Sequence, residues 1–92
     1  MIKSFAHKGL EKFFLTGSKA GIQPAHADKL SRQLAILNIA KDAKEMDKPG
    51  WKLHRLVGRD AGRWSVWVNG NWRLVFRFED GNALLVDYRD YH

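Results

Sequence analysis

The spacing of apolar residues changes at one point in this chain, at Pro49-Gly50. Before that point, apolar side chains recur every three or four residues, which is typical of helices packed on one side. After it, they alternate with polar side chains, which is typical of strands in a sheet with one buried face. Because a chain of 92 residues forms a single core, we predict one domain over residues 1–92.

Two helices are predicted in the first half. Leu10, Phe13 and Phe14 lie on one face of a helix expected over residues 7–16, which Gly17 is suited to end. Pro24 suits the first turn of a second helix, which is expected to run to about residue 40 because apolar residues recur through it at helical spacing. Two short elements complete this half: a strand at Ile2–Phe5 and a helical turn within Asp42–Lys48.

The second half is predicted to form an antiparallel meander. Alternating runs over residues 64–69, 72–79 and 83–88 are separated by Asn69-Gly70 and Asp80-Gly81, two dipeptides that favour tight hairpin turns. A further strand at residues 51–57 would join them through Gly58–Gly62. On the last strand, Leu84, Val86 and Tyr88 are expected to share one face. Helices followed by a meander predict an α+β fold, with two helices on one face of a mainly antiparallel sheet of four to five strands.

The positive charge is concentrated in the predicted strands. The chain has a formal charge of +6, which favours an anionic partner such as nucleic acid. Residues 1–50 contribute +4, residues 51–78 contribute +5 and residues 79–92 contribute −3. The chain contains no cysteine, no apolar run near the roughly 20 residues that span a bilayer, and no secretory signal, so a cytoplasmic protein is expected, without membrane partners.

Several kinds of site lack support in the sequence. The four histidines have no close mutual spacing and there is no cysteine, so neither a metal nor another cofactor is expected. Phosphate-binding glycine motifs and a serine-nucleophile elbow are absent. On the predicted strands, Arg73 lies on the face opposite the apolar one. His54 can lie on the face opposite Trp51, although an ordinary half-exposed histidine is the commoner case.

Proton-transferring side chains gather at the end of the chain. The segment Asp87–His92 is either a frayed polar tail or a strand end held beside the basic strands, where Asp90, Tyr91 and His92 would act on a bound phosphate. Among the tryptophans, Trp64 and Trp72 fall on apolar strand faces and are expected in the core. Trp51 and Trp67 are the candidates for exposed rings that stack on RNA bases.

Short segments spread over the whole chain carry a family resemblance. They are Met1-Ile2-Lys3-Ser4-Phe5, His7-Lys8-Gly9-Leu10, Gly21-Ile22-Gln23-Pro24, Pro49-Gly50-Trp51-Lys52-Leu53-His54, Trp64-Ser65-Val66, Gly70-Asn71-Trp72-Arg73-Leu74 and Asp87-Tyr88-Arg89-Asp90-Tyr91-His92. In this order, the chain resembles the HigB toxins of the RelE-like superfamily of bacterial type II toxin–antitoxin systems. The resemblance implies a RelE-like fold and a metal-independent ribonuclease that cuts messenger RNA in the ribosomal A site.

The resemblance also implies residue roles and partners. It places the catalytic residues at His54, Asp90, Tyr91 and His92, and the candidate RNA-binding residues are Lys52, Arg55, Arg59 and Arg73. Relatives commonly carry an active-site lysine where this chain has Val57, so Arg55, Arg59 and Arg73 are the candidate replacements. The implied partners are the ribosome with its messenger RNA and a helix-turn-helix antitoxin of the HigA type, with operator DNA bound only through the toxin–antitoxin complex.

Two other functions remain open at this stage. Because position 57 is valine and not the lysine that the resemblance implies, the chain could instead be a weakly catalytic or non-catalytic module of the same fold, which binds its antitoxin and regulates its operon. A ribonuclease that cuts free RNA without a ribosome is the third possibility.

Overall fold

The helices precede the sheet along the chain, as predicted. The computed structural model describes residues 1–91, so His92 lies outside the described residues. The elements in order are α1 (Lys8–Thr16), η1 (Pro24–His26), α2 (Ala27–Ile39), η2 (Ala43–Met46), β1 (His54–Arg55), η3 (Gly58–Asp60), β2 (Arg63–Asn69), β3 (Trp72–Glu79) and β4 (Asn82–Asp90). The strands form an antiparallel sheet of four strands in the order β1-β2-β3-β4. The α+β fold class is therefore confirmed.

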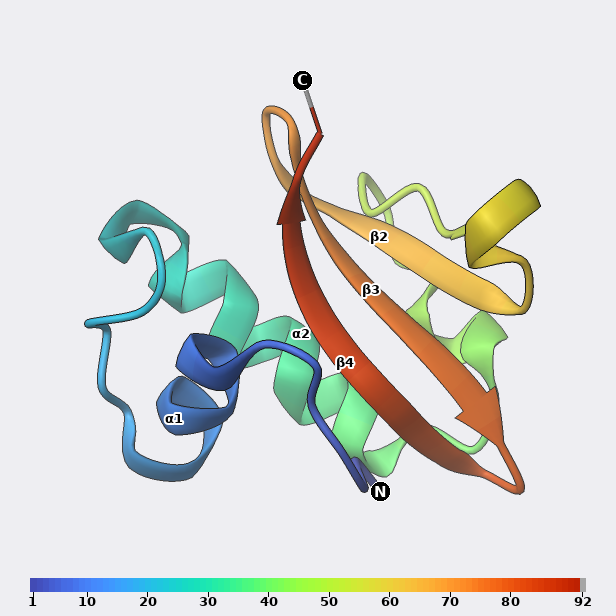
Figure 1. The fold of residues 1–92 in the computed structure, drawn as a ribbon, viewed down its shortest axis with the longest axis horizontal. Helices are drawn as coiled ribbons and strands as arrows, with labels where there is room; N and C mark the ends of the chain where they lie inside the picture. The colour runs from blue at the N-terminus through green and yellow to red at the C-terminus, as the bar shows by residue number, and fades with distance from the viewer. Residues whose placement is uncertain (92) are drawn as a thin grey trace.

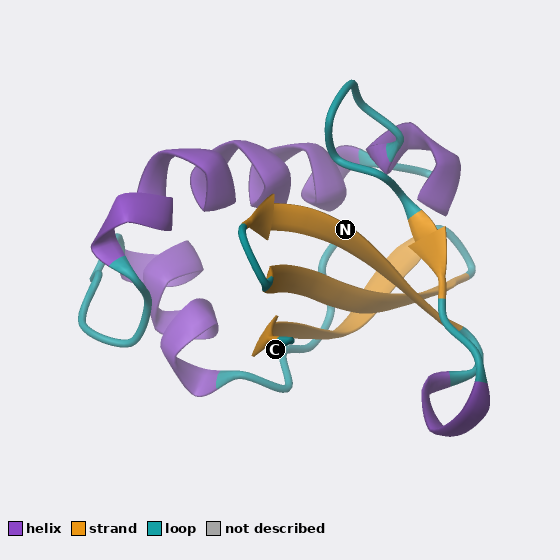
Figure 2. Ribbon diagram, turned by 90° about the horizontal axis from the view of Figure 1, so that it is seen from above, coloured by secondary structure: helices purple, strands orange, loops and turns teal. Residues whose placement is uncertain are grey.

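The helices cover one face of the sheet. Figure 2 shows α2 lying along that face, with α1 beside it and η3 standing apart at the other end of the strands. The core between the layers is apolar, because the buried side chains of α1 and α2 meet the apolar faces of β2, β3 and β4. Its fully buried members include Leu10, Leu30, Leu34, Leu37, Val66, Leu74, Phe76 and Val86. Within residues 1–91, no helix is both long and apolar enough to cross a membrane.

Local signals in the sequence explain where the helices begin and end. The His7 side chain accepts a hydrogen bond at Nδ1 from the Leu10 N–H at 2.9 Å, which caps α1. Gly17 ends α1 in the left-handed conformation (φ 81°), and its N–H donates to the Phe13 carbonyl at 2.8 Å. Pro24 opens the turn η1, which leads directly into α2. Both predicted helices are confirmed.

Two glycines let α1 approach the loop that follows it. A Cβ added at Gly9 would lie 2.6 Å from the Gly21 carbonyl oxygen, and one added at Gly21 would lie 2.5 Å from the Gly9 Cα. These contacts involve backbone atoms on both sides, so neither position has room for a larger residue.

The last strand contains a bulge that corrects the predicted pattern. Val75 pairs with Asp87 and Arg77 pairs with Leu84, so β4 has one extra residue there. Leu85, within this bulge, has a positive φ of 53°. As a result Ala83 faces the core together with Val86 and Tyr88, whereas Leu84 is only half-buried. The expectation that Leu84 shares the buried face was wrong, because the bulge reverses the alternation.

The N-terminal segment runs beside β4 (Figure 1). The predicted strand at Ile2–Phe5 is present only as two isolated parallel bridges, Ile2 to Ala83 and Phe5 to Val86. A continuous ladder is interrupted at Leu85, where the N–H donates instead to the Ser4 hydroxyl at 2.9 Å. The segment nevertheless pairs with an edge that would otherwise be open.

The predicted strand over residues 51–57 is much shorter in the structure. Lys52 has a positive φ of 51°, which interrupts an extended chain, and only His54–Arg55 pairs as a strand. Single hydrogen bonds extend the contact with β2 on either side, from the Trp67 N–H to the Trp51 carbonyl (2.7 Å) and from the Leu56 N–H to the Arg63 carbonyl (2.9 Å).

The tryptophans divide differently from the prediction. Trp51 is only 4% exposed and belongs to the core, so its proposed role in base stacking was wrong. Trp64 and Trp72, expected in the core, are half-buried against it. Trp67 is 39% exposed, in agreement with the expectation.

A buried polar cluster lies between η1 and β4. The His26 Nδ1 and the Tyr88 hydroxyl are 2.6 Å apart, and the Tyr88 ring stacks on Trp72 with centroids 4.4 Å apart. The Gln23 N–H also donates to the Tyr88 hydroxyl, at 3.4 Å. Burial lowers the pKa of His26 and raises the pKa of Tyr88, so both side chains are neutral in the fold.

Candidate functional site

The face of the sheet opposite the helices carries two rows of side chains set by the strand register. In one row, His54 pairs with Ser65, Ser65 with Val75, and Val75 with Asp87. In the neighbouring row, Trp67 pairs with Arg73, and Arg73 with Arg89. Cross-strand neighbours lie about 4.5–5.5 Å apart, so each row brings groups from distant parts of the chain together.

A hollow of about 400 Å³ lies on this face. It is lined by Lys52, His54, Leu56, Ser65, Trp67, Arg73 and Tyr91. The volume is in the range of pockets that hold a small ligand or one unit of a larger one. Four of the predicted site residues, Lys52, His54, Arg73 and Tyr91, are therefore brought together.

Two cations flank Trp67 in this hollow. The Lys52 Nζ lies 4.6 Å from a Trp67 ring centroid, and the Arg73 guanidinium lies 4.4 Å from one. Arg73 is also held by the hairpin turn, because its Nη1 donates to the carbonyls of Gly70 (2.7 Å) and Trp72 (3.0 Å). The left-handed backbone at Lys52 precedes the short strand that carries His54. The hollow thus offers an aromatic ring and two positive charges next to an imidazole.

His54 is exposed on β1 and faces this hollow. Among residues 1–91, no side chain forms a hydrogen bond with its ring. An exposed imidazole facing a hollow is a side chain that can serve as a general acid or base for a bound substrate.

The C-terminal residues are split between two hollows. The Tyr91 N–H donates to the Asn71 carbonyl at 2.8 Å, so the chain end continues beside β3 instead of fraying. Tyr91 lines the hollow of His54 and also a second, more open hollow with Asp60, Arg89 and Asp90. Asp90 pairs with Trp72 at the end of β4 and lines this second hollow, but not the hollow of His54. His92, the remaining predicted catalytic residue, lies outside the described residues.

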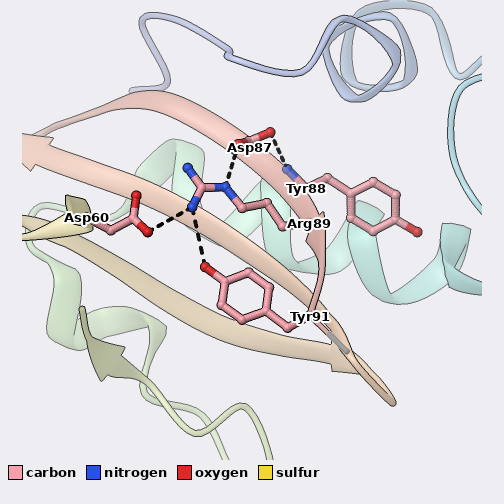
Figure 3. A network of polar contacts seen from close by, with 5 residues as sticks. All are labelled: Asp60, Asp87, Tyr88, Arg89 and Tyr91. Atoms are coloured by element: carbon pink, nitrogen blue, oxygen red, sulfur yellow. Dashed lines mark hydrogen bonds and ion pairs between the residues drawn. The ribbon is translucent and has the colours of Figure 1, made fainter. Parts of the chain in front are cut away.

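Arg89 contacts three polar side chains, those of Asp60, Asp87 and Tyr91 (Figure 3). Its Nε donates to Asp87 at 2.7 Å, and its Nη1 lies 3.2 Å from Asp60 and donates to the Tyr91 hydroxyl at 3.3 Å. Burial lowers the pKa of Arg89, but the hydrogen bonds that its guanidinium donates to Asp87, Tyr91 and Asp60 outweigh burial, so the pKa is raised. Sequence reasoning missed Arg89 and Asp60 because their contact depends on the bulged register of β4 and on the position of η3.

The remaining predicted RNA-binding residues lie outside the hollow of His54. The Arg55 guanidinium lies 5.5 Å from the Trp64 ring, a residue on the helix-facing side of β2. Arg59 belongs to η3 and does not line this hollow, and Val57 is 85% exposed and does not line it either. Of the three candidate replacements for the family lysine, only Arg73 lies in the hollow.

No group of three or more His, Asp or Glu side chains within residues 1–91 is arranged to bind a metal ion. The side chains that line the hollow include an imidazole, a phenol, an ammonium and a guanidinium.

Comparison with known proteins shows the family of this chain. The model of a family described as the RelE-like toxin HigB of type II toxin–antitoxin systems matches residues 3–92. A protein of Proteus vulgaris named endoribonuclease HigB is 39% identical over 92 residues, covering the whole of both chains. Toxin HigB-1 of Vibrio cholerae serotype O1 is 33% identical over 94 aligned positions, covering all of this chain and 98% of the relative. The chain belongs to the HigB family of RelE-like toxins of type II toxin–antitoxin systems.

Proposed function

We propose that this chain is an endoribonuclease that requires the ribosome and cleaves messenger RNA in the A site, and so inhibits translation. One observation carries the proposal: the strand register brings His54 into the same hollow as Tyr91 and the cations Lys52 and Arg73. The naming of the Proteus vulgaris relative as an endoribonuclease supports the same activity. The protein would act in the cytoplasm, where messenger RNA and ribosomes are found.

The proposed reaction is an attack of an RNA 2′-OH on the adjacent phosphate. The bond from the 2′-oxygen to phosphorus forms while the bond from phosphorus to the 5′-oxygen breaks, which leaves a 2′,3′-cyclic phosphate and a 5′-OH. A base takes the proton of the 2′-OH and an acid gives a proton to the leaving 5′-oxygen. Because side chains provide the proton transfer and the positive charge, the reaction is metal-independent and needs no cofactor.

The residues divide these tasks as follows. His54 and His92 share the two proton transfers, with Asp90 orienting a histidine. Tyr91 positions the RNA or donates a hydrogen bond from its phenol. Arg73 and Lys52 stabilise the charge on the phosphorane, because preformed positive groups at such a site act without reorganisation.

The proposed partners follow from the family. A toxin of a type II system has an antitoxin partner, and we propose one of the HigA type with a helix-turn-helix. Operator DNA would be bound only by the toxin–antitoxin complex.

The test uses ribosomes programmed with an end-labelled messenger RNA. The wild type should cut the RNA at the A-site codon, and His54→Ala or His92→Ala should lower the rate by about 10²-fold or more. Arg32→Gln, on the exposed side of α2, is the control and should retain the wild-type rate. Equal cutting of RNA without ribosomes would contradict the ribosome requirement.

A second candidate is a non-catalytic module that binds its antitoxin and regulates its operon. It is favoured by one observation, the exposed Val57 where relatives commonly carry an active-site lysine. Expression in cells separates the two functions. The ribonuclease should arrest growth and the double substitution of His54 and His92 by alanine should relieve the arrest, whereas the non-catalytic module is harmless in both forms.

A further inference from the structure

We propose that Arg89 is a positioning residue, which holds the Tyr91 phenol at the boundary of the two hollows and ties it to η3 through Asp60. This inference rests on the proposed function, because it assigns Tyr91 a part in RNA cleavage. It also makes a claim about the structure of the protein that is measurable without any activity.

The first support is the number of contacts made by one guanidinium. Arg89 donates from Nε to Asp87, and its Nη1 contacts both Asp60 and the Tyr91 hydroxyl. The planar fork of an arginine orients these contacts more sharply than a single ammonium does. Figure 3 shows the guanidinium lying between Asp60 on one side and Asp87 on the other, with the Tyr91 hydroxyl pointing toward it.

The second support is the charge around Arg89. Two carboxylates, Asp60 and Asp87, lie within hydrogen-bond or ion-pair distance of this one cation. An arginine whose charge is balanced by two carboxylates attracts a nearby RNA phosphate only weakly. Arg73 differs, because it donates hydrogen bonds to two neutral carbonyls and lies over the ring of Trp67. Within the described part of the chain, Arg73 is therefore the cation suited to the phosphate, and Arg89 the one suited to holding other side chains.

The third support is the position of Tyr91 itself. It follows the last residue of β4, and its backbone is held by the hydrogen bond to Asn71. Its side chain is 39% exposed, and its hydroxyl has the Arg89 Nη1 as its hydrogen-bond partner in the described structure. A side chain at a strand end has several rotamers available, so the contact with Arg89 selects one of them.

Asp60 gives the cluster a second anchor. It ends η3, which lies in the connection between β1 and β2 and so follows the strand of His54. The ion pair between Arg89 and Asp60 (3.2 Å) therefore links the segment after His54 to the segment before Tyr91. His54 and Tyr91 both line the hollow, and a shift of about 1 Å between reacting groups lowers rates by up to about a hundredfold.

The kinetic experiment compares Arg89→Gln, Arg89→Lys and the control Arg32→Gln on programmed ribosomes. Arg89→Gln should lower the cleavage rate at saturating toxin by about ten- to hundredfold, with the half-saturating concentration within about twofold of wild type. Arg89→Lys keeps the positive charge but lacks the planar guanidinium that makes several contacts at once, so its rate should stay close to that of Arg89→Gln. A rise in the half-saturating concentration at an unchanged rate, or full rescue by lysine, would overturn the proposal and make Arg89 an RNA-binding charge.

A double-mutant cycle tests whether Arg89 acts through Tyr91. Tyr91→Phe removes the hydroxyl that Arg89 contacts, so adding Arg89→Gln to Tyr91→Phe should lower the rate by less than about twofold further. If the rate of the double variant is lowered by the full product of the two single effects, the proposal is overturned. If Arg89→Gln does not fold, Asp60→Asn on the half-buried end of the cluster should lower the rate in the same direction by a smaller factor, and a wild-type rate for that variant contradicts the proposal.

A spectroscopic measurement separates this proposal from the proposed function. The chain has two tyrosines, so labelling with 3-fluorotyrosine gives two ¹⁹F signals, with buried Tyr88 as the internal reference. Arg89→Gln should shift or broaden the Tyr91 signal and leave Tyr88 in place, and Arg32→Gln should change neither. If Arg89→Gln leaves the Tyr91 signal unmoved, the positioning role of Arg89 is overturned even if the wild type cleaves RNA. If the signal moves but the wild type has no ribonuclease activity, only the proposed function is refuted.

Discussion

Trp67 and Arg73 face each other across the β2–β3 register, and the Arg73 guanidinium lies 4.4 Å from a ring centroid of Trp67. The Lys52 ammonium also lies 4.6 Å from a ring centroid of Trp67. An exposed ring next to two cations is suited to RNA, because the ring can stack with a base and the cations can bind phosphates.

The first prediction concerns that ring. Trp67→Ala should raise the half-saturating concentration for RNA cleavage by about fivefold or more, since stacking contributes about 1–3 kcal/mol per base. Trp67→Phe should retain part of the effect. The measurement is a titration of toxin against programmed ribosomes. Trp67→Ala with a wild-type half-saturating concentration would contradict a stacking role.

The second prediction concerns Lys52. If its ammonium contacts a phosphate, Lys52→Gln should reduce the slope of log affinity against log salt by about one. Lys44→Gln, on the exposed turn η2, loses the same charge in the helical layer and is the control, which should keep the slope. Equal slopes for Lys52→Gln and the wild type would place Lys52 away from the RNA.

The third prediction is a pH dependence of stability caused by His26. Burial lowers its folded pKa below the ordinary value of 6.5, so the unfolded chain binds more protons between the two values. The stabilisation is therefore complete above pH 6.5 and is lost as the pH falls toward the lowered pKa. Urea unfolding of the wild type from pH 8 to pH 5 should show a steeper loss than His26→Gln, and parallel curves for the two proteins would contradict this.

The fourth prediction concerns the contact between Gly9 and Gly21. An alanine at position 9 would gain about 1 kcal/mol in helix propensity, but it would place a methyl group against the backbone of Gly21. Overpacking of this kind costs about 1–3 kcal/mol, so the net effect should be a loss of unfolding free energy. Thermal or urea unfolding gives the answer, and a stabilised Gly9→Ala would show that the two segments are not in contact.

Much of the fold follows from local signals in the sequence. The capped helix α1, the second helix after Pro24 and the hairpin at Asp80-Gly81 depend on neighbouring residues only. At that hairpin, both residues adopt positive φ values (50° and 77°), as a tight turn with the twist of a sheet requires. Such features are encoded within a few residues and were predicted correctly.

The features that were missed depend on residues far apart in the chain. Nothing in the local sequence shows that Lys52 takes a left-handed conformation and shortens the strand that follows. The burial of Trp51 likewise follows from the tertiary packing of the core around it. The candidate site was predicted in part for the same reason: His54 and Arg73 lie on predictable strand faces and Tyr91 follows the last strand, but the contacts of Arg89 require a register that includes a bulge.

The bulge at Leu85 determines which side chains of β4 face away from the core, on the side of the hollows. Ala83 and Tyr88 both face the core although they are five positions apart, a spacing that would place them on opposite sides of a regular strand. If the same sequence formed a regular strand without the bulge, either Ala83 or Tyr88 would therefore turn away from the core. In the second case, Arg89 would turn inward and its charge would meet apolar side chains. The single extra residue thus determines which side chains of β4 face the core and which face the hollows.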